Sequence, residues 1–349
     1  MMLSTEIAEA ARYCLANGIN FAVYAMPGSP DVTFIADDGT PWSGDESDMK
    51  GFFINSFMNR YPVPVLIRPQ WDCRSVIGQN GEIPVKSTWK EKSTPREKYL
   101  RDIRNLTATL KRDGGKTVIS RVICRSASDI DWVKVADRYF AAYPSTFRFM
   151  YYTGQTGGWL GATPETILSR DTATSVITTM SLAGTRVRSN LPWDSKNIAE
   201  HNFVTDYIVN LFRAEGIIPE VHEAENVGYG EIEHLCHRIT ARYDGAILPL
   251  LHRLSPTPAL AGVPLTAALD NIARYESHDR GCYGGYVGVN DESGLHTFVN
   301  LRSVRFDRDN YCVYAGGGIT AASSPENEWA ETEAKVARLM SIIQSESHE

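Results

Sequence analysis

The stretch YAGGGITAASSPENEWAETEAKVARLM, residues 314–340, indicates how this chain folds around its candidate site. A strand with three consecutive glycines leads into a helix, in which Ser324 is the predicted N-cap and Pro325 the first helical residue. This start fixes the helical phase and predicts two faces. The apolar face comprises Trp329, Val336, Leu339, Met340 and Ile343, and the polar face carries Glu328, Glu331 and Lys335. The polar face is either a solvated surface with an i,i+4 Glu–Lys pair or one wall of a site.

The segments upstream of this stretch predict an α+β fold. Residues 96–112 carry apolar side chains on one side and end at Gly114-Gly115, which predicts a helix with a glycine stop. The next segment, KTVISRVICR at 116–125, is rich in β-branched residues and predicts a strand. Hairpins and helices then alternate to the end of the chain. This mixture favours mainly antiparallel sheets over a doubly wound parallel sheet.

Composition and charge exclude several classes of protein. The chain has 349 residues, 43% of them hydrophobic and 22% charged, as is typical of a soluble globular protein. A net charge of −7 and the lack of any Lys/Arg block argue against nucleic acid or an anionic membrane as a partner. The start, residues 1–18, has the pattern of an amphipathic helix and not of a secretion signal, and no apolar run approaches 18 residues. We therefore expect a cytoplasmic protein.

The six cysteines are widely scattered and contain no CxxC pair. This spacing predicts free thiols in a reducing compartment. The cysteines are Cys14, Cys73, Cys124, Cys236, Cys282 and Cys312.

Several motifs that suggest a cofactor lack the required spacing. The glycine clusters at 154–162, 283–288 and 315–319 match neither a dinucleotide fingerprint nor a Walker A loop. They are better interpreted as segments whose main-chain N–H groups can approach a carboxylate or phosphate closely. The sequence EHLCHR at 233–238 has no second ligand cluster, which argues against zinc.

Two ionisable residues stand at the boundaries of predicted strands. Lys116 opens a strand directly after Gly114-Gly115, and Glu165 lies in the turn GATPET between two apolar strands. Each residue taken alone is most simply a solvated side chain, because Lys and Glu are mostly exposed in proteins.

Two further residues are harder to explain as surface positions. Glu200 lies on the apolar face of a predicted helix, where its charge needs either the helix N-terminus or a cation. Together with Glu331 it would form an oxygen site of the kind that Mg²⁺ prefers. Arg302 lies in TFVNLRSVRF and shares a face with Phe298 and Asn300 if the strand alternates throughout. An inward-pointing guanidinium would hold a carboxylate in bidentate fashion.

Ten motifs in order resemble those of the chorismate-utilising enzymes, which include isochorismate synthase, salicylate synthase, anthranilate synthase component I and aminodeoxychorismate synthase component I. The resemblance covers roughly residues 98–345. The motifs are KTVISR, GATPE, SLAGTR, EHNFVTDYIV, EHLCHRI, PTPALAGVP, YGGYVGV, FVNLRSVRF, YAGGGI and SSPENEWAETEAK.

The resemblance implies one large α+β domain, in which two packed, mainly antiparallel sheets are flanked by helices and the site lies in a cleft. Residues 1–95 would form a shortened N-terminal portion integrated into the same fold, and residues 96–349 the chorismate-binding catalytic region.

The resemblance also implies a magnesium site and a chorismate site. Glu200 and Glu331 would hold Mg²⁺, Glu328 would act through water, and the ion would bind the ring carboxylate of chorismate. The anchor for the pyruvyl carboxylate would combine side chains with backbone N–H groups of the glycine turn, and a loop containing Gly184 and Thr185 would face the leaving hydroxyl. The residues that the resemblance assigns to the substrate are Gly184, Thr185, His234, Tyr283, Arg302, Gly316, Gly318 and Lys335.

Two positions indicate water as the nucleophile. Anthranilate synthase typically lacks the lysine found here at 116, and aminodeoxychorismate synthase carries a nucleophilic lysine where this chain has Ala183. Neutral Lys116 would remove a proton from water as it adds to ring C2, and protonated Glu165 would give a proton to the departing C4 hydroxyl. We therefore expect an isochorismate synthase that needs no glutaminase subunit.

Three alternatives stay open from the sequence. Salicylate synthase also has the lysine and eliminates pyruvate from isochorismate in the same site. An ammonia-using synthase and a homologue that binds chorismate without turnover are the other two. Asn197 stands where the family often has an acid, and Ser255 replaces a usual histidine. Menaquinone and siderophore pathways are equally compatible with the sequence.

Overall fold

The computed structural model describes residues 2–81, 91–127, 129–229 and 232–346. The side chains of Thr185, Lys196, Glu200, Tyr229 and Ile232 lie outside this description, although their backbones are included. The α-helices of the described residues are α1 (Thr5–Asn17), α2 (Arg96–Asp113), α3 (Trp132–Ala142), α4 (Ser195–Ala214), α5 (Ile247–Leu254), α6 (Leu265–Tyr275) and α7 (Pro325–Glu346).

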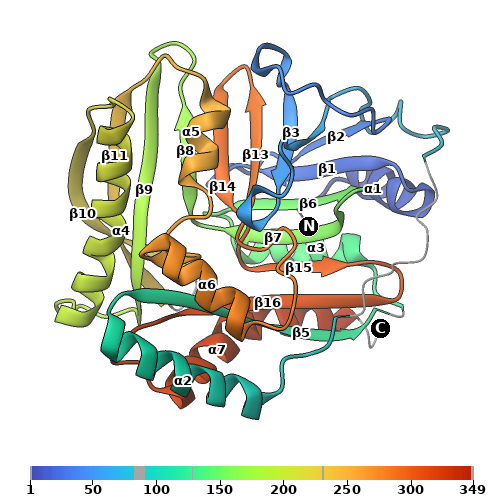
Figure 1. The fold of residues 1–349 in the computed structure, drawn as a ribbon. Helices are drawn as coiled ribbons and strands as arrows, with labels where there is room; N and C mark the ends of the chain where they lie inside the picture. Colours follow the sequence, from blue (N-terminus) through green and yellow to red (C-terminus); the bar gives the residue numbers. More distant parts are fainter. Residues whose placement is uncertain (1, 82–90, 128, 230–231, 347–349) are drawn as a thin grey trace.

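Two antiparallel sheets of eight strands each form the framework, as the α+β prediction requires (Figure 1). In spatial order the first sheet contains β12 (Gly262–Val263), β5 (Lys116–Ser126), β16 (Asn310–Ile319), β15 (Ser303–Phe306), β7 (Gly157–Thr163), β6 (Phe147–Thr153), β1 (Asn20–Ala25) and β2 (Thr33–Asp37). The second contains β10 (Glu220–Tyr229), β11 (Ile232–Arg242), β9 (Val176–Val187), β8 (Thr166–Arg170), β14 (Gly294–Val299), β13 (Tyr286–Asp291), β3 (Gly51–Asn55) and β4 (Val65–Ile67).

Helices cover the outer faces of the sheets. α7 packs on β16 and contacts α2 and α3, whereas α4 packs on β9 and β11 at the far end of the second sheet (Figure 1). α6 packs against β5 and β12. None of the helices in the described part of the chain is long and apolar enough to span a bilayer.

The two helices that were predicted in most detail form where expected. α2 begins at Arg96, buries Tyr99, Ile103 and Leu106, and ends at Gly114, whose φ of 76° lies in the left-handed region. α7 begins at Pro325 after Ser324, as the capping signal predicts. Its residues Val336, Leu339 and Ile343 are buried, whereas Trp329 and Met340 of the predicted apolar face are only partly buried. Periodicity thus located the packing face correctly.

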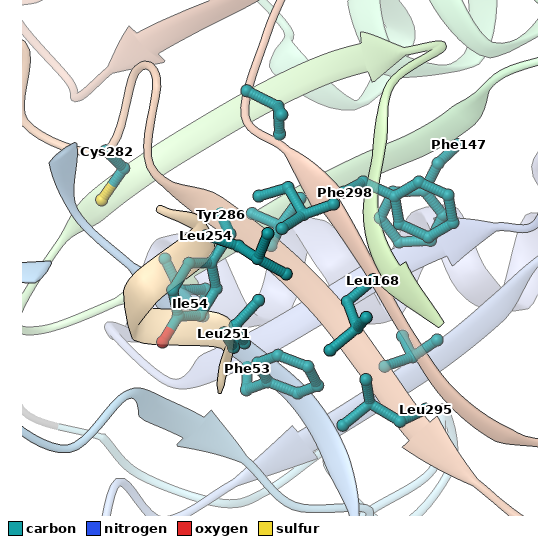
Figure 2. Close-up of a cluster of buried hydrophobic side chains, with 14 of the residues drawn as sticks. Phe53, Ile54, Phe147, Leu168, Leu251, Leu254, Cys282, Tyr286, Leu295 and Phe298 are labelled. Atoms are coloured by element: carbon teal, nitrogen blue, oxygen red, sulfur yellow. The ribbon is translucent and has the colours of Figure 1, made fainter. Parts of the chain in front are cut away.

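The main core lies between the two sheets and is strongly aromatic. Phe147 of β6 stacks on Phe298 of β14, with ring centroids 4.2 Å apart and planes 7° from parallel (Figure 2). Phe52 of β3 contacts Phe147, Phe149 and Tyr151. Because large aromatic side chains bury 150–250 Å² each, about as much as any side chain can, these contacts hold the sheets together.

The chain crosses from the second sheet to the first between β14 and β15. Residues 300–302 make this crossing, and Arg302 has a left-handed φ of 49°. The prediction of one alternating strand through Phe298, Asn300 and Arg302 is therefore wrong. Alternation ends at Val299, because the backbone must turn to reach the other sheet.

The prediction that all six cysteines are free thiols is wrong for two of them. Cys124 of β5 lies directly opposite Cys312 of β16, and the two form a disulfide. Cys14, Cys73, Cys236 and Cys282 are free. The pair is 188 residues apart in the sequence, so only the register of the two strands brings its members together.

Loss of one stacked ring between the sheets should destabilise the whole fold. We expect Phe298→Ala to lower the free energy of unfolding by about 3–5 kcal/mol, because the surroundings cannot collapse fully into the space left. Urea denaturation followed by fluorescence measures this change. Phe203→Ala, on a half-exposed side chain of α4, is the control and should change stability by less than about 0.5 kcal/mol. Equal effects of the two substitutions would contradict the assignment of this core.

Candidate active site

One cavity collects most of the residues that the sequence singled out. Its walls come from both sheets, from the crossing at 301–302 and from α7. The lining includes Lys116, Glu165, Gly184, His234, Tyr283, Arg302, Gly316, Gly318, Glu331 and Lys335. Residues more than 200 positions apart therefore face a common space.

Lys116 and Glu165 are both buried in the walls of this cavity. Lys116, the first residue of β5, is 4% exposed, and Glu165, in the turn between β7 and β8, is 5% exposed. Gly115 makes the entry to β5 possible, because its φ is 86° and a Cβ there would lie 2.5 Å from the carbonyl oxygen of Val263. The simple interpretation of both residues as solvated side chains is therefore wrong.

The carboxyl group of Glu165 keeps its proton to a much higher pH than an exposed glutamate, and about half of it is still protonated near pH 7. Burial raises its pKa to about 7, although a hydrogen bond from Thr257 and the charge of Lys116 both act to lower it. The Thr257 hydroxyl lies 3.3 Å from Glu165 Oε1. A buried carboxyl group with a pKa near the working pH is suited to donating a proton.

A bulge in β9 forms part of the cavity wall. His234 of β11 pairs with Thr185, but Leu235 pairs with Ala183, so Gly184 is the extra residue. Its φ of 72° favours glycine, and a Cβ there would lie 3.3 Å from atoms of Asn197 on α4. The side chain of Thr185 lies outside the described residues.

His234 is neutral and oriented by this bulge. Its Nδ1 lies 3.1 Å from the carbonyl oxygen of Gly184, which can only accept, so Nδ1 carries the proton. Burial lowers the pKa of His234 to about 4, and the charges of Arg302 and Lys335 add to this effect. Nε2 therefore carries no proton and can only accept a hydrogen bond.

A cationic group lies where the chain crosses between the sheets. Arg302 Nη1 is 3.5 Å from the carbonyl oxygen of Lys335 on α7, and Lys335 Nζ donates to the carbonyl of Gly316 at 2.8 Å. Tyr283 is buried close to Gly316, because its hydroxyl would be 3.2 Å from a Cβ at that glycine. These contacts bring α7, the crossing and β16 to one corner of the cavity.

The glycine strand offers backbone groups at this corner. Gly316 lies opposite Ser120, and Gly318 lies opposite Val118. The N–H of Ser120 is bonded to Glu276 and that of Val118 to Ala261, on the far side of β5. Both are therefore non-hydrogen-bonded pairs of the antiparallel ladder. In such pairs the N–H groups of the two residues point away from each other, so the N–H groups of Gly316 and Gly318 point away from β5.

The acidic face of α7 approaches β16 at the middle glycine. A Cβ on Gly317 would lie 3.0 Å from Glu328 Oε2 and 3.9 Å from Glu331 Oε1. Glu328 is buried, whereas Glu331 lines the cavity and pairs with Lys335 Nζ at 2.6 Å. The interpretation of this face as a solvated surface is therefore wrong for Glu328.

The described carboxylates have the chemistry of a hard-cation site. Glu328 and Glu331 converge on one point of β16 from adjacent turns of α7, and carboxylate oxygens are the ligands that Mg²⁺ prefers. Among the described side chains, no group of three or more His, Cys, Asp or Glu could hold a metal ion by itself. Glu200, the other expected ligand, lies on α4, but its side chain is outside the described residues.

The sequence reasoning missed several lining residues. Tyr314 and Leu260 contribute to the cavity, as do Val118 and Leu301. Tyr314 could have been predicted from the sequence, because it precedes Gly316 by two residues on the same strand and therefore lies on the same face. Leu260 carries no chemical signal of its own.

Comparison with known proteins finds relatives of this chain in both sequence and structure. Residues 74–344 match the family model described as "Chorismate binding enzyme". Isochorismate synthase EntC of Escherichia coli (strain K12) is 31% identical over 256 residues, which cover 68% of this chain and 64% of EntC. Anthranilate synthase component 1 2 of Haloarcula marismortui is 31% identical over 277 residues, which cover 73% of this chain and 51% of that protein. The matched region is therefore less than two thirds of either relative.

The fold agrees with a solved structure. The structure of MenF, the menaquinone-specific isochorismate synthase from Escherichia coli, superposes with a TM-score of 0.80 over 98% of this chain and 91% of that chain. The sequence identity in this alignment is 19%, so the likeness concerns the fold.

The raised pKa of Glu165 should make stability depend on pH. The unfolded chain loses this proton near pH 4.3, whereas the folded protein loses it near pH 7. The stability that protonated Glu165 contributes is fully present below about pH 4.3, the pKa in the unfolded chain, and is lost as the pH rises through about 7, the pKa in the folded protein. Glu165→Gln cannot ionise, so its free energy of unfolding relative to wild type should increase by up to about 3–4 kcal/mol from acidic to mildly basic pH.

Urea denaturation across this pH range measures the difference. Glu223→Gln, at an exposed position of β10, is the matched control and should follow the wild type throughout. A constant difference between Glu165→Gln and wild type at all pH values would show that Glu165 ionises normally.

Proposed function

Because the chain belongs to the chorismate-binding enzyme family, whose model matches residues 74–344, we propose that it is an isochorismate synthase. It would convert chorismate to isochorismate by adding water at ring C2 and releasing the C4 hydroxyl. The observation that carries this proposal is the burial of Lys116 and Glu165 in the walls of one cavity. A base and an acid held in one buried site are what such an exchange of hydroxyl groups requires.

Each of the two residues has one proton to move. Lys116, in its neutral form, takes a proton from the attacking water as the C2–O bond forms and the ring double bond shifts. Glu165 gives its proton to the C4 oxygen as that bond breaks, and a water molecule leaves. The pKa of about 7 supports the acid role, because about half of the Glu165 carboxyl groups then carry a proton at neutral pH. Each contribution is typically worth about 10²–10⁴ in rate.

The cationic corner of the cavity would hold the pyruvyl carboxylate. Arg302 can donate two hydrogen bonds in its plane, and Tyr283 adds a hydroxyl close to Gly316. The N–H groups of Gly316 and Gly318, which point away from β5, complete the set. His234 would accept a hydrogen bond from the substrate at Nε2, because its Nδ1 donates to the carbonyl oxygen of Gly184.

The ring carboxylate would be held with the help of Mg²⁺. By family resemblance Glu331 and Glu200 are direct ligands and Glu328 acts through water. The ion would supply the positive charge that the carboxylate needs, and Lys335, 2.6 Å from Glu331, orients that ligand. The close approach of Glu328 and Glu331 to Gly317 supports this part of the proposal.

Two features favour water over ammonia as the nucleophile. Lys116 lines the cavity as the proposed base, and position 183, where an aminodeoxychorismate synthase carries its lysine, is a buried alanine in the lining. We propose that no glutaminase subunit is needed. Salicylate synthase is the second candidate, because it shares the lysine. The similar identities to an isochorismate synthase and to an anthranilate synthase component make the product the deciding measurement.

Product analysis tests the proposed reaction. The purified protein with chorismate and Mg²⁺ should give isochorismate, with or without ammonium, and a chelator should abolish turnover. Chromatography identifies the products. Salicylate with pyruvate would favour the second candidate, an amino product would favour an ammonia-using synthase, and no product would favour a homologue that only binds.

Removing the proposed base should slow turnover far more than it weakens binding. We expect Lys116→Ala to reduce kcat by about 10²–10⁴, because general base assistance contributes a factor of this size. Lys134→Ala, at an exposed position of α3, is the control and should retain wild-type kcat. Steady-state kinetics with chorismate measures both. Full activity of the Lys116 variant would exclude it as the base.

A further inference from the structure

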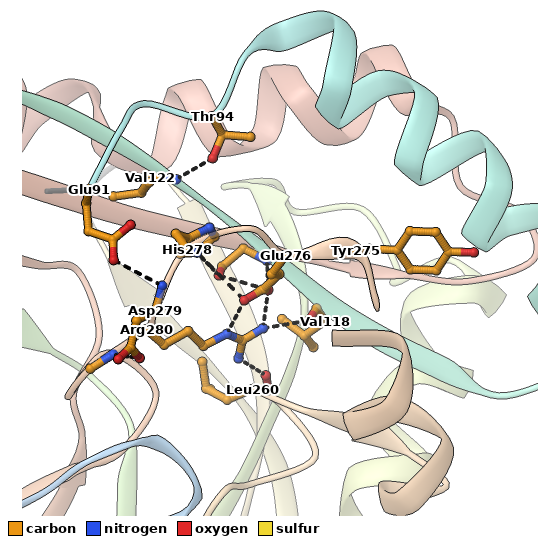
Figure 3. Close-up of polar contacts among 12 residues, drawn as sticks. Glu91, Thr94, Val118, Val122, Leu260, Tyr275, Glu276, His278, Asp279 and Arg280 are labelled. Carbon is orange, nitrogen blue, oxygen red and sulfur yellow. Dashed lines mark hydrogen bonds and ion pairs between the residues drawn. The ribbon is translucent and has the colours of Figure 1, made fainter. Parts of the chain in front are cut away.

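A buried polar cluster lies directly beside the cavity and is not used by the proposed chemistry. It consists of Glu276, His278 and Arg280, which follow α6 (Figure 3), and of Ser120 on β5. The side chains of Glu276, His278 and Arg280 are at most 3% exposed, and Ser120 is 2% exposed. Ionised groups at this depth are costly unless they are paired and hydrogen-bonded.

Glu276 is ionised, and both of its carboxylate oxygens accept hydrogen bonds. Its carboxylate accepts from the N–H of Ser120 at 2.6 Å, from the Ser120 hydroxyl at 2.9 Å and from Arg280 Nε at 2.9 Å. Burial raises its pKa, but the charge and hydrogen bonds of Arg280, together with His278 and Ser120, hold it below the ordinary value. Glu276 therefore fixes the guanidinium of Arg280 in one orientation.

His278 completes the cluster as a neutral donor. The Ser120 hydroxyl donates to Glu276, so it must accept from His278 Nε2, which is 2.9 Å away. The ring of His278 lies 6.2 Å from that of Tyr314, a lining residue of the cavity. The cluster thus extends the inner wall of the cavity along β5 and β16.

Arg280 bridges two separate segments of the cavity wall. Its Nη2 donates to the carbonyl of Val118 and its Nη1 to the carbonyl of Leu260, both at 2.8 Å (Figure 3). Val118 and Leu260 both line the cavity. The guanidinium therefore cross-links β5 to the segment that leads into β12.

This cross-link stands next to the proposed base. The ladder between β16 and β5 ends at Thr117, so Lys116 lies one residue beyond it and pairs instead with Val263. β12 has only two residues. Beyond β12, the bond from Val118 N–H to the carbonyl of Ala261 and the Arg280 bridge join the same two segments.

We propose that Arg280, oriented by Glu276, is a positioning residue that fixes Lys116 in the wall of the active site. The role rests on the proposed function, because it is Lys116 as a base that must be held. Arg280 itself is not among the residues that line the cavity. It acts by holding the backbone two residues after Lys116 against the segment that pairs with it.

A lysine at position 280 cannot reproduce the bridge that Arg280 makes between Val118 and Leu260. The guanidinium bonds Glu276 through two nitrogens and both carbonyls at once, whereas an ammonium is a single point with three donors. We expect Arg280→Lys to keep the charge pair with Glu276 but to loosen the strand end. A small displacement of a catalytic group can cost about 100-fold in rate, so kcat should fall about 10- to 100-fold while KM stays within about twofold.

A second measurement needs no turnover. In the wild type Lys116 is 4% exposed and should be protected from an acylating reagent, as quantified by mass spectrometry against exposed Lys134. In Arg280→Lys the labelling of Lys116 should rise severalfold. Arg60→Lys is the matched control, because Arg60 pairs with Asp279 of the same segment at the exposed surface. It should leave both kcat and labelling unchanged.

The outcomes separate this proposal from the proposed function. Lower kcat, near-constant KM and higher labelling of Lys116 in folded Arg280→Lys support the positioning role. Unchanged labelling overturns it even if kcat falls, and so does unchanged kcat in an active enzyme. If the wild type makes no isochorismate, the proposed function fails, and the labelling alone decides whether Arg280 holds Lys116. If Arg280→Lys does not fold, Glu276→Gln is measured in the same way and judged by the same criteria.

Discussion

The close approach of α7 to the glycine backbone of β16 is the contact on which the rest of the site depends. Gly317 has no side chain, so Glu328 comes to 3.0 Å from the position a Cβ would take. The apolar residues of α7 hold the helix on the first sheet, and Arg121 of β5, 4.0 Å from the Trp329 ring centroid, anchors its start. With the helix seated there, Glu331 and Lys335 face the cavity. A side chain at position 317 would press on the Glu328 carboxylate and force it to shift.

The second constraint is that the site is shared between two sheets. β5 and β16 belong to the first sheet and β9 and β11 to the second, and Arg302 lies where the chain passes between them. The aromatic core that joins the sheets therefore also fixes the spacing across the cavity. Such an arrangement buries ionisable groups, which is why the pKa of Glu165 is raised and that of His234 is lowered. Arg302 and Lys335 bring positive charge to the cavity of a chain whose net charge is −7, as the proposed substrate with its two carboxylates would require.

The helices and the order of the polar motifs could be predicted because they depend on local patterns. The phase of α7 followed from Ser324 and Pro325, and α2 followed from its apolar spacing and the glycines that end it. Strand alternation failed at Arg302, since the turn at 300–302 responds to the position of the other sheet and not to neighbouring residues. The disulfide between Cys124 and Cys312 was missed for the same reason, because it depends on the register of two strands.

The sequence by itself determined the fold class, the acidic and apolar faces of α7, and the set of polar residues that resembles a chorismate site. The tertiary structure alone decided that Lys116 and Glu165 are buried in one cavity, that Gly184 is the bulge that orients His234, and that Arg280 bridges Val118 to Leu260. The physical reason is that burial, pKa and hydrogen-bond partners depend on contacts between segments far apart in the chain. Local residue patterns specify which groups are present, and packing specifies what each group meets.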